Sequence, residues 1–264
     1  MLFIGINTKG GVGKSSFTGQ CLVPYVHYKN GGEIVNYVEI DDQNESIRNL
    51  AESELIAPQI VKTENVETFA MHLMLENTDA VIDVGGNITA QLFLERVNEM
   101  GGMRGNAIYF IPLLDSLQDL QNAIKTYELI READTQSKIV FVLNRCVNKS
   151  NKELTKEQFL FVYGKKELSI PSLSELIDEE VPVLLINQST TFNILAYLKR
   201  TMAEVAQQDV KEALEEAILK NKEDPKARGE ALRLLYHEKI IGSCRKIVQQ
   251  EFLPLFEEID SILA

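Results

Sequence analysis

Short apolar runs alternate with amphipathic stretches over most of the chain. Each run is rich in β-branched or aromatic residues and is bounded by glycine, asparagine or aspartate, which is typical of buried strands. Apolar residues spaced three and four positions apart follow most of the runs and predict helices. The alternation predicts an α/β fold, with a doubly wound, mostly parallel sheet and helices on both of its faces. Strands are expected at 2–7, 34–40, 59–61, 107–112, 138–143 and 181–186, and another within 79–86.

Helical periodicity follows the strands and then takes over the end of the chain. Helices are expected at 14–26, 43–51, 66–75, 92–100, 117–130 and 190–206. Beyond Gln207 the pattern is only helical, because two apolar stripes are separated at 221–225 and Pro254 kinks or restarts the last segment. We therefore expect a sheet domain over residues 1–206 and a helical C-terminal extension over 207–264. The extension packs on the sheet domain, pairs with its own copy or docks a partner protein.

The composition fits a globular protein of the cytoplasm. Hydrophobic residues make up 45% of the 264 residues, and no apolar run approaches the length of about 18 residues that a membrane-spanning helix needs. The chain passes from Met1 directly into a strand, without the basic stretch or cleavage site of a secretory leader. The cysteines and histidines stand singly, which argues against a disulfide framework and against a structural zinc site. They are Cys21, Cys146 and Cys244, and His27, His72 and His237.

The net charge of −12 narrows the classes of partner. Proteins that grip DNA through its phosphates usually present a basic face, so any DNA binding must come from a local patch. One basic group lies in an expected insertion at 147–180 and another in the helix at 190–206; the alternative for both is a solvated surface. The candidate DNA contacts are Lys149, Lys152, Lys165, Lys166, Lys199 and Arg200. The acidic balance disfavours adhesion to anionic lipid.

A glycine-rich turn between the first strand and the first helix predicts a phosphate-binding site. Glycines allow backbone N–H groups to approach a phosphate chain without a Cβ clash, and the helix N-terminus adds partial positive charge. Lys14 would neutralise the β- and γ-phosphates, while the Ser15 hydroxyl would ligate Mg²⁺. The expected nucleotide-binding residues are Gly10, Gly11, Val12, Gly13, Lys14, Ser15 and Ser16.

The sequence of this turn resembles that of a known family. The strict phosphate-loop pattern asks for glycine at position 8, where this chain has Thr8, but Lys9–Ser15 reads KGGVGKS. This stretch is similar to the deviant Walker A motif of the ParA/MinD family of ATPases. The resemblance implies a homodimer that encloses ATP, in which Lys9 reaches the nucleotide of the other subunit and stabilises transition-state charge. The alternative for Lys9 is a solvated loop lysine.

Acidic residues follow the second strand, where ligands bind in open α/β sheets. The stretch from Glu39 resembles the D-x-D-P-Q segment of ParA-like proteins, with Glu39 in place of the first Asp and Asp42 in place of Pro. The resemblance implies that Asp41 orients the attacking water and lies near Mg²⁺, and it leaves the register open between Asp41 and Asp42. The alternative is an acidic N-cap for the helix at 43–51.

A second carboxylate is expected at the end of the strand within 79–86. A carboxylate at a strand end can hold the Mg²⁺ hydration shell, and a glycine N–H just after it can contact the γ-phosphate. The stretch resembles the Walker B and second switch region, with Asp83 as the acidic residue and Gly86 as the phosphate contact.

Asparagines end the last two expected strands. The resemblance implies that Asn144 reads the adenine edge and that Asn187 lies near the adenine pocket, whereas a turn at the strand end is the alternative for Asn144. Arg145 either stacks on the base or is solvated.

The resemblance covers residues 1–206 and implies a slow ATPase whose dimer holds cargo until hydrolysis releases it. The cargo would be plasmid or chromosomal DNA, with an adaptor protein that activates hydrolysis and with location at the nucleoid. Two alternatives remain: a nucleotide-binding module of a plasmid stability or conjugation complex with weak hydrolysis, and a MinD-like positioner that cycles on a membrane. Four acidic residues argue against a C-terminal membrane helix, namely Glu251, Glu257, Glu258 and Asp260.

Overall fold

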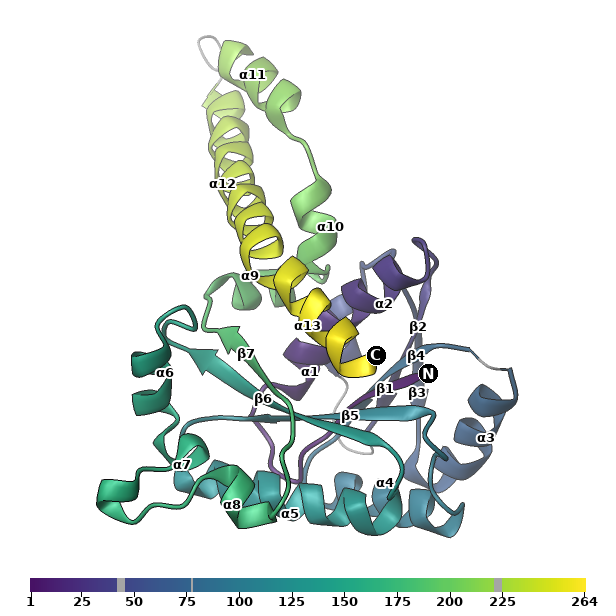
Figure 1. The fold of residues 1–264 in the computed structure, drawn as a ribbon. Coiled ribbons are helices and arrows are strands. Elements are labelled where there is room, and N and C mark those ends of the chain that lie inside the picture. The colour runs from purple at the N-terminus through teal and green to yellow at the C-terminus, as the bar shows by residue number, and fades with distance from the viewer. Residues whose placement is uncertain (42–45, 77, 221–224) are drawn as a thin grey trace. The chain divides into compact units, whose positions relative to one another are not determined.

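The computed structural model describes residues 1–41, 46–76, 78–220 and 225–264 (Figure 1). The chain forms two compact units. The first, which we call the sheet unit, contains residues 1–48 and 54–189 together with Ala264. The second, the helical unit, contains residues 49–53 and 190–263.

A seven-stranded sheet forms the centre of the sheet unit, and every strand pair in it is parallel. The strand order is β3-β2-β4-β1-β5-β6-β7. The strands are β1 (Leu2–Gly5), β2 (Val35–Ile40), β3 (Ile56–Val61), β4 (Ala80–Val84), β5 (Ala107–Leu113), β6 (Lys138–Cys146) and β7 (Val183–Asn187). The predicted α/β fold with a doubly wound, mostly parallel sheet is confirmed, and the first strand lies in the middle of the sheet, as the expected phosphate loop requires.

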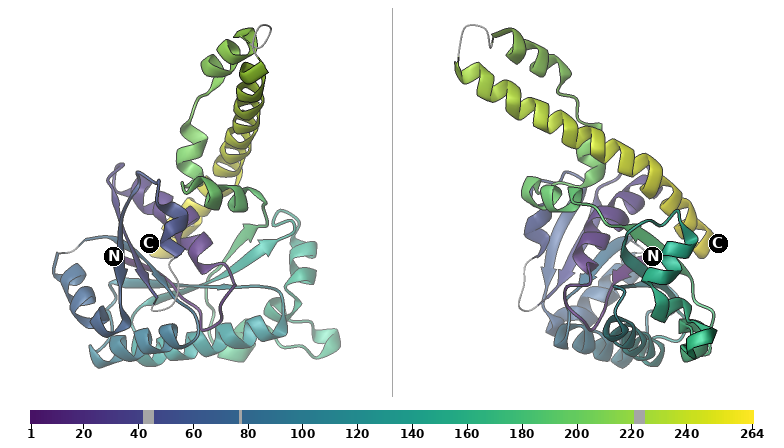
Figure 2. Two further views of the ribbon diagram at one scale, coloured as in Figure 1. Left: turned by 180° about the vertical axis from the view of Figure 1, so that it is seen from behind. Right: turned by 90° about the vertical axis from the view of Figure 1, so that its left-hand side faces the viewer.

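Helices cover both faces of this sheet (Figures 1 and 2). One face carries α3 (Val66–Glu76), α4 (Ile88–Glu99) and α5 (Leu117–Ala133); the other carries α1 (Lys14–Phe17) and α2 (Val23–Lys29). Strand β1 is buried along its whole length because alternate side chains pack against opposite layers. Ile4 belongs to the large apolar cluster that includes α4 and α5, whereas the ring of Phe3 meets Tyr25 of α2 edge to face, with centroids 5.6 Å apart.

The first helix is continuous but changes its pitch before a proline. A π-helical stretch, η1 (Thr18–Leu22), joins α1 to α2, and Pro24 follows it. The same arrangement recurs in the helical unit, where η5 (Val248–Phe252) joins α12 (Pro225–Ile247) to α13 (Leu253–Leu263) just before Pro254. A proline has no N–H and its ring crowds the carbonyl four residues back, so a wider turn lets the helix continue. Pro254 therefore does not end the helix.

The predicted insertion between the last two strands is helical. It contains α6 (Lys152–Gln158), α7 (Leu160–Tyr163), the 3-10 turn η4 (Lys166–Leu168) and α8 (Leu173–Ile177). Two other 3-10 turns flank β3: η2 (Ser46–Leu50) and η3 (Thr63–Asn65). The helix expected at 43–51 is thus a 3-10 turn over its described part, and residues 42–45, Asp42 among them, lie outside the described residues.

The helical unit contains α9 (Thr191–Leu198), α10 (Met202–Gln207), α11 (Lys211–Lys220), α12 and α13. The single helix expected at 190–206 is wrong: Lys199 adopts a left-handed conformation with φ 55°, which ends α9. Thr201 then caps α10 through a capping box with Glu204. The units divide at Ser189–Thr190, and the division into 1–206 and 207–264 stays a prediction.

No helix in the described parts of the chain is long and apolar enough to cross a membrane. The three cysteines are buried and form no disulfide with one another. Among the described residues no cluster of three or more histidine, cysteine, aspartate or glutamate side chains could hold a metal ion by itself.

Candidate functional site

The loop between β1 and α1 is fixed by buried polar side chains. Asn7 is fully buried; its Nδ2 donates to the carbonyl of Pro112 at 2.8 Å and its Oδ1 accepts from the Lys9 N–H at 2.7 Å. Thr8, the residue that departs from the strict pattern, is also buried, and its N–H donates to Oγ1 of Thr126 in α5 at 3.0 Å. The Thr8 hydroxyl also donates to the carbonyl of Asn122 in α5 at 3.3 Å, a bond that a glycine at this position could not make.

Gly13 closes the loop at the point where the helix begins. Its φ of 92° lies in the left-handed region, and a Cβ on it would lie 2.0 Å from Nδ2 of Asn144. That Nδ2 donates to the carbonyl of Val12 at 2.9 Å. The end of β6 thus holds the loop from one side, and only glycine fits between them.

The Lys14 side chain is buried inside the loop that it follows. Its Nζ donates to the carbonyl of Lys9 at 3.1 Å, so the ammonium lies in the concavity made by the glycine-rich backbone. Burial lowers the pKa of Lys14, and the charges of Asp83 and Asp41 oppose that effect. A buried ammonium among backbone amides is the electrostatic setting that a polyphosphate needs.

Asp83 lies at the end of β4 and is buried, with only 3% of its surface exposed. Its Oδ2 accepts from Ser46 Oγ at 3.1 Å and from the phenol of Tyr37 at 3.4 Å, whereas Oδ1 has no hydrogen-bond partner in the described part of the chain. Burial raises the pKa of Asp83 to about 6, although the Ser15 hydroxyl and the Lys14 ammonium lower it. A buried carboxylate oxygen without a partner, next to a serine hydroxyl, fits a Mg²⁺ site.

The segment after β4 packs directly against the phosphate loop. A Cβ on Gly86 would lie 3.1 Å from the Gly10 nitrogen and 3.4 Å from Nζ of Lys14, so Gly86 and the loop share one site. Asp41 lies beside this segment as well, because a Cβ on Gly85 would lie 2.8 Å from its Oδ2. The fold brings Asp41, Asp83, Gly86 and the loop together.

Glu39, which stands in place of the first Asp of the motif, binds backbone and hydroxyl groups of its own chain. The carboxylate is buried and accepts from the N–H of Ser46 at 2.6 Å and from the N–H of Ile47 at 3.0 Å. It also accepts a short hydrogen bond from the Ser46 hydroxyl. Glu39 therefore caps η2 and is not directed at a ligand. Sequence reasoning missed Ser46 and Tyr37, because nothing in their local sequence marks them as neighbours of Asp83.

Lys9 is held by a carboxylate of its own chain. Its Nζ lies 2.6 Å from Oδ1 of Asp119, a buried residue in the first turn of α5. Ser116, the N-cap of that helix, donates a short hydrogen bond to the other oxygen of Asp119. This pair was not predicted from the sequence, because Asp119 occupies a polar position on an amphipathic helix. The role of Lys9 toward a second subunit stays a prediction.

The asparagines that end β6 and β7 hold backbone groups. Asn144 donates to Val12, as noted above, and its Oδ1 accepts from the Arg145 N–H at 2.9 Å. Asn187 accepts from the N–H of Lys149 at 2.8 Å. Arg145 is exposed and has a left-handed backbone with φ 60°. Base recognition by these residues stays a prediction, and Asn144 has a structural role in the loop.

No protein-family model matches the sequence, and a search of curated proteins finds no match either. Among solved structures, apo McdA from Cyanthece is similar with a TM-score of 0.52 and 13% sequence identity, over 80% of this chain and 94% of McdA. The chain thus shares the α/β fold of apo McdA, with a parallel sheet between layers of helices. FlhF complexed with GMPPNP/Mg²⁺ aligns with a TM-score of 0.41 and 12% identity, over 75% of this chain and 74% of FlhF.

The candidate DNA contacts are divided between the two compact units. Lys149, Lys152, Lys165 and Lys166 lie in the insertion of the sheet unit; Lys149 is half-buried and the other three are exposed. Lys199 and Arg200 belong to the helical unit, where the Arg200 guanidinium lies 3.7 Å from a carboxylate oxygen of Glu204. Their role toward DNA stays a prediction.

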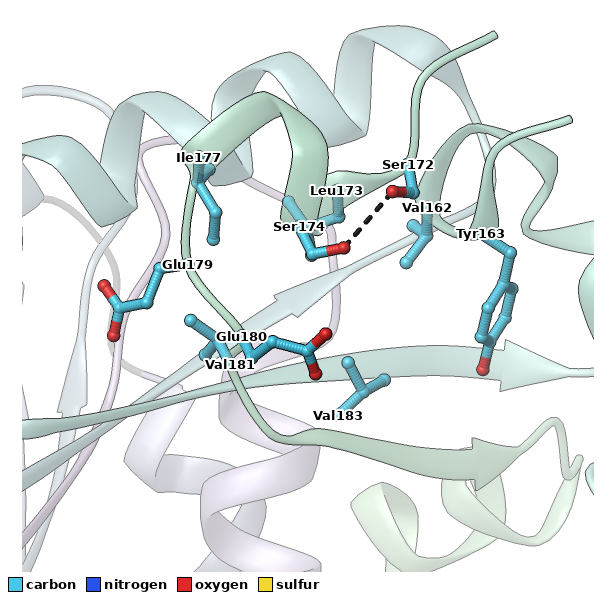
Figure 3. Close-up of a pocket in the computed structure, with 10 residues that line it drawn as sticks. All are labelled: Val162, Tyr163, Ser172, Leu173, Ser174, Ile177, Glu179, Glu180, Val181 and Val183. Atoms are coloured by element: carbon cyan, nitrogen blue, oxygen red, sulfur yellow. Dashed lines mark hydrogen bonds between the residues drawn. The ribbon is translucent and has the colours of Figure 1, made fainter. Parts of the chain in front are cut away.

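A second concavity lies away from the phosphate loop (Figure 3). This pocket has a volume of about 350 Å³, and α7, α8 and the start of β7 line it. Its walls are apolar apart from two serines, Glu179 and Glu180, and Glu179 is held by Arg131 at 2.6 Å. The pocket is at the amino end of β7, whereas the phosphate loop follows the carboxyl end of β1, and none of the predicted site residues lines it.

Proposed function

We propose that this protein is a switch ATPase that binds ATP and Mg²⁺ at the phosphate loop, dimerises in that state and positions or segregates a cargo. The observation that carries the proposal is the pairing of a buried Lys14 ammonium in a glycine-rich loop with Asp83, whose Oδ1 has no hydrogen-bond partner among the described residues. A buried cation and a buried anion side by side prepare a site for a metal–polyphosphate complex. The similarity of the fold to apo McdA agrees with this proposal.

The roles of the residues follow from their positions. Lys14 would turn from the Lys9 carbonyl to the phosphates, and the backbone N–H groups of Gly10–Ser16 would bind phosphate oxygens. Ser15 and Asp83 would hold Mg²⁺, which would neutralise phosphate charge, with Asp41 close to the same site. Asp41 would orient the attacking water, and the N–H of Gly86 would contact the γ-phosphate.

ATP as the nucleotide and a dimer as the active state come from the resemblance of the KGGVGKS motif. The adenine would lie near Asn144, Arg145 and Asn187, at the carboxyl ends of β6 and β7. An adaptor protein would activate hydrolysis. DNA is the cargo that fits the exposed lysines of the insertion in a chain whose net charge is −12.

Nucleotide binding is the first test. We expect Mg-ATP to bind the purified protein in calorimetric titrations and expect Lys14→Ala to weaken binding about 100-fold or more, because the buried cation is lost. Lys125→Ala, which removes an exposed lysine from α5, is the control and should bind as the wild type does. Equal loss in both variants, or no binding of ATP or GTP to the wild type, would refute the proposal.

DNA as the cargo is tested by measuring the binding of non-specific duplex DNA at physiological salt. The wild type should bind DNA with Mg-ATP and lose it with Mg-ADP, and both Lys9→Ala and Lys14→Ala should abolish the ATP-dependent part. Absence of DNA binding in every nucleotide state would leave a nucleotide switch that docks a protein, and the DNA part of the proposal would be wrong.

A nucleotide-binding module with weak hydrolysis is the second candidate. One observation favours it. Glu39, which stands in place of the first Asp of the motif, binds the N–H groups of Ser46 and Ile47, so Asp41 beside the loop would have to act on the water without it. Single-turnover hydrolysis separates the candidates, because Asp41→Ala should slow a switch ATPase and leave the background rate of a binding module unchanged.

A further inference from the structure

A short segment of the chain leaves the sheet unit and returns to it. Residues up to Arg48 belong to the sheet unit, residues 49–53 to the helical unit, and the sheet unit resumes at Glu54. We call Ser46–Ser53 the strap. It connects the two units covalently, in addition to the chain connection at Ser189–Thr190.

The first end of the strap is attached at the metal-site carboxylate. Ser46 Oγ lies 3.1 Å from Oδ2 of Asp83 and also hydrogen-bonds Glu39, which further accepts from the N–H groups of Ser46 and Ile47. Glu39 and Asp83 stand at the same register on the neighbouring strands β2 and β4. A hydroxyl has a single proton, so the Ser46 hydroxyl can donate to only one of these two carboxylates at a time.

The other end of the strap is attached to the helical unit. The N–H of Glu52 donates to the carbonyl of Lys199 at 3.0 Å, and the Ser53 hydroxyl donates to Oε2 of Glu204 at 2.8 Å. The same Oε2 accepts from the N–H of Thr201 at 2.8 Å and from its hydroxyl at 2.7 Å. The strap therefore ends on the capping box that starts α10, at the break between α9 and α10.

The chain just after the strap is attached to the sheet again. The N–H of Val35, the first residue of β2, donates to the carbonyl of Leu55 at 2.8 Å, and β3 then pairs with β2 along its length. Both sides of the strap are thus tied to β2, while its Glu52 and Ser53 are tied to the helical unit.

We propose that the strap transmits the state of the nucleotide site to the start of α10. This inference rests on the proposed function, because Mg²⁺ and ATP supply the signal. A cation bound to Asp83 would make its carboxylate a weaker hydrogen-bond acceptor, so the Ser46 hydroxyl would then donate to Glu39 alone. The position of η2 changes with that choice, and the bonds of Glu52 and Ser53 pass the change to Lys199 and the α10 cap.

Hydrogen–deuterium exchange of residues 199–207 tests the inference in the full-length protein. In the wild type, Mg-ATP should change the exchange of these amides. Ser53→Ala should reduce that response about twofold or more, and Ser46→Ala, which cuts the same path at its other end, should do the same. ATP affinity, measured separately, should stay within about twofold for Ser53→Ala because this residue lies outside the phosphate loop.

Thr201→Ala is the matched control. It weakens the cap of the same helix and should raise exchange at 199–207 with and without nucleotide, but it leaves the Ser53–Glu204 bond and hence the response to Mg-ATP. The inference would be overturned if both Ser53→Ala and Ser46→Ala showed the wild-type change in exchange on adding Mg-ATP. It would also be overturned if the wild type bound Mg-ATP without any change in the exchange of residues 199–207. A wild type that does not bind Mg-ATP would instead refute the proposed function, and the inference with it.

Discussion

Gly13, in the phosphate loop, and Gly242, in the second half of α12, are glycines with opposite surroundings. Gly13 has φ 92°, and a Cβ on it would lie 2.0 Å from Asn144, whereas a Cβ on Gly242 would meet no described atom within 4 Å. The first position requires the absence of a side chain, and the second only tolerates it. The comparison shows that a side chain at Gly13, where the loop would bind phosphate, would meet a specific atom of Asn144. A side chain at Gly242 would lie on the exposed surface of α12.

The two units also differ in their buried charged side chains, which among the described residues all lie in the sheet unit. The sheet unit buries Lys14 and Asp83 close together, at a cost in solvation that only a ligand or a partner group repays. Among the described residues, the buried polar side chains of the helical unit are those of Thr191 and Thr201, which carry no charge. Substitutions at the buried charges of the sheet unit should therefore change nucleotide binding, whereas a substitution on the exposed surface of α12 should change stability alone.

The largest loss of stability is expected from Gly13→Ala. A left-handed alanine costs about 1–2 kcal/mol, and the displaced Asn144 amide loses its bond to Val12, about 1 kcal/mol more. Urea unfolding and nucleotide titration should both show the loss. Gly11→Ala is the control, because Gly11 also has a positive φ, 78°, but its Cβ would meet no described atom within 4 Å. Equal losses in the two variants would mean that Asn144 does not constrain the loop.

Asp83→Asn should stabilise the protein and remove metal-dependent nucleotide binding. Since one pKa unit corresponds to about 1.36 kcal/mol, a pKa raised from 3.8 to about 6 costs the folded state on the order of 3 kcal/mol at neutral pH. The amide removes the buried charge and keeps the shape. Thermal unfolding at pH 8 without Mg²⁺ should show a higher midpoint for the variant, and a lower midpoint would contradict the burial argument.

The difference in stability between Asp83→Asn and the wild type should increase with pH. The folded protein holds the Asp83 proton more tightly than the unfolded chain, so this residue contributes stability below its unfolded pKa of 3.8 that is lost as the pH rises through about 6. The variant and the wild type should therefore differ little near pH 4 and most above pH 7. A constant difference across this range would assign the effect to packing instead of charge.

A smaller effect is expected at the pair formed by Lys9 and Asp119. If Lys9 acts on the nucleotide of a second subunit, Asp119→Asn releases it and should strengthen ATP-dependent dimerisation about two- to fivefold, which is the value of a partly exposed ion pair. Sedimentation velocity with Mg-ATP measures the change. Glu128→Gln removes the same charge from an exposed position of α5 and serves as the control. Unchanged association of Asp119→Asn would show that this ion pair does not restrain Lys9.

The smallest effect, of opposite sign to the first, is expected for Gly242→Ala. Alanine restricts the unfolded chain and suits a helix interior, so the free energy of unfolding should rise by about 0.5–1 kcal/mol. Urea titration followed by circular dichroism measures the shift, and nucleotide affinity should not change. A destabilised variant would reveal a close contact at this position and would break the contrast with Gly13.

Contiguous motifs made the fold and part of the site predictable. The sheet and its first helix follow from apolar runs, and the loop from Lys9 to Ser15 contains its glycines, its lysine and its serine in one stretch. Asp83 was predictable because a buried strand ends beside it. The break at Lys199 was not, since a left-handed lysine leaves no trace in a pattern of apolar residues.

By itself, the sequence determined the parallel α/β fold and the phosphate loop, because these depend on residues close together in the chain. Only the tertiary structure decided which distant groups meet. Parallel pairing of β2 and β4 sets Glu39 beside Asp83, and the packing of α5 brings Asp119 to Lys9. Burial then fixes their chemistry, because a carboxylate removed from water must find a hydrogen-bond donor, a cation or a proton, and no local pattern specifies which.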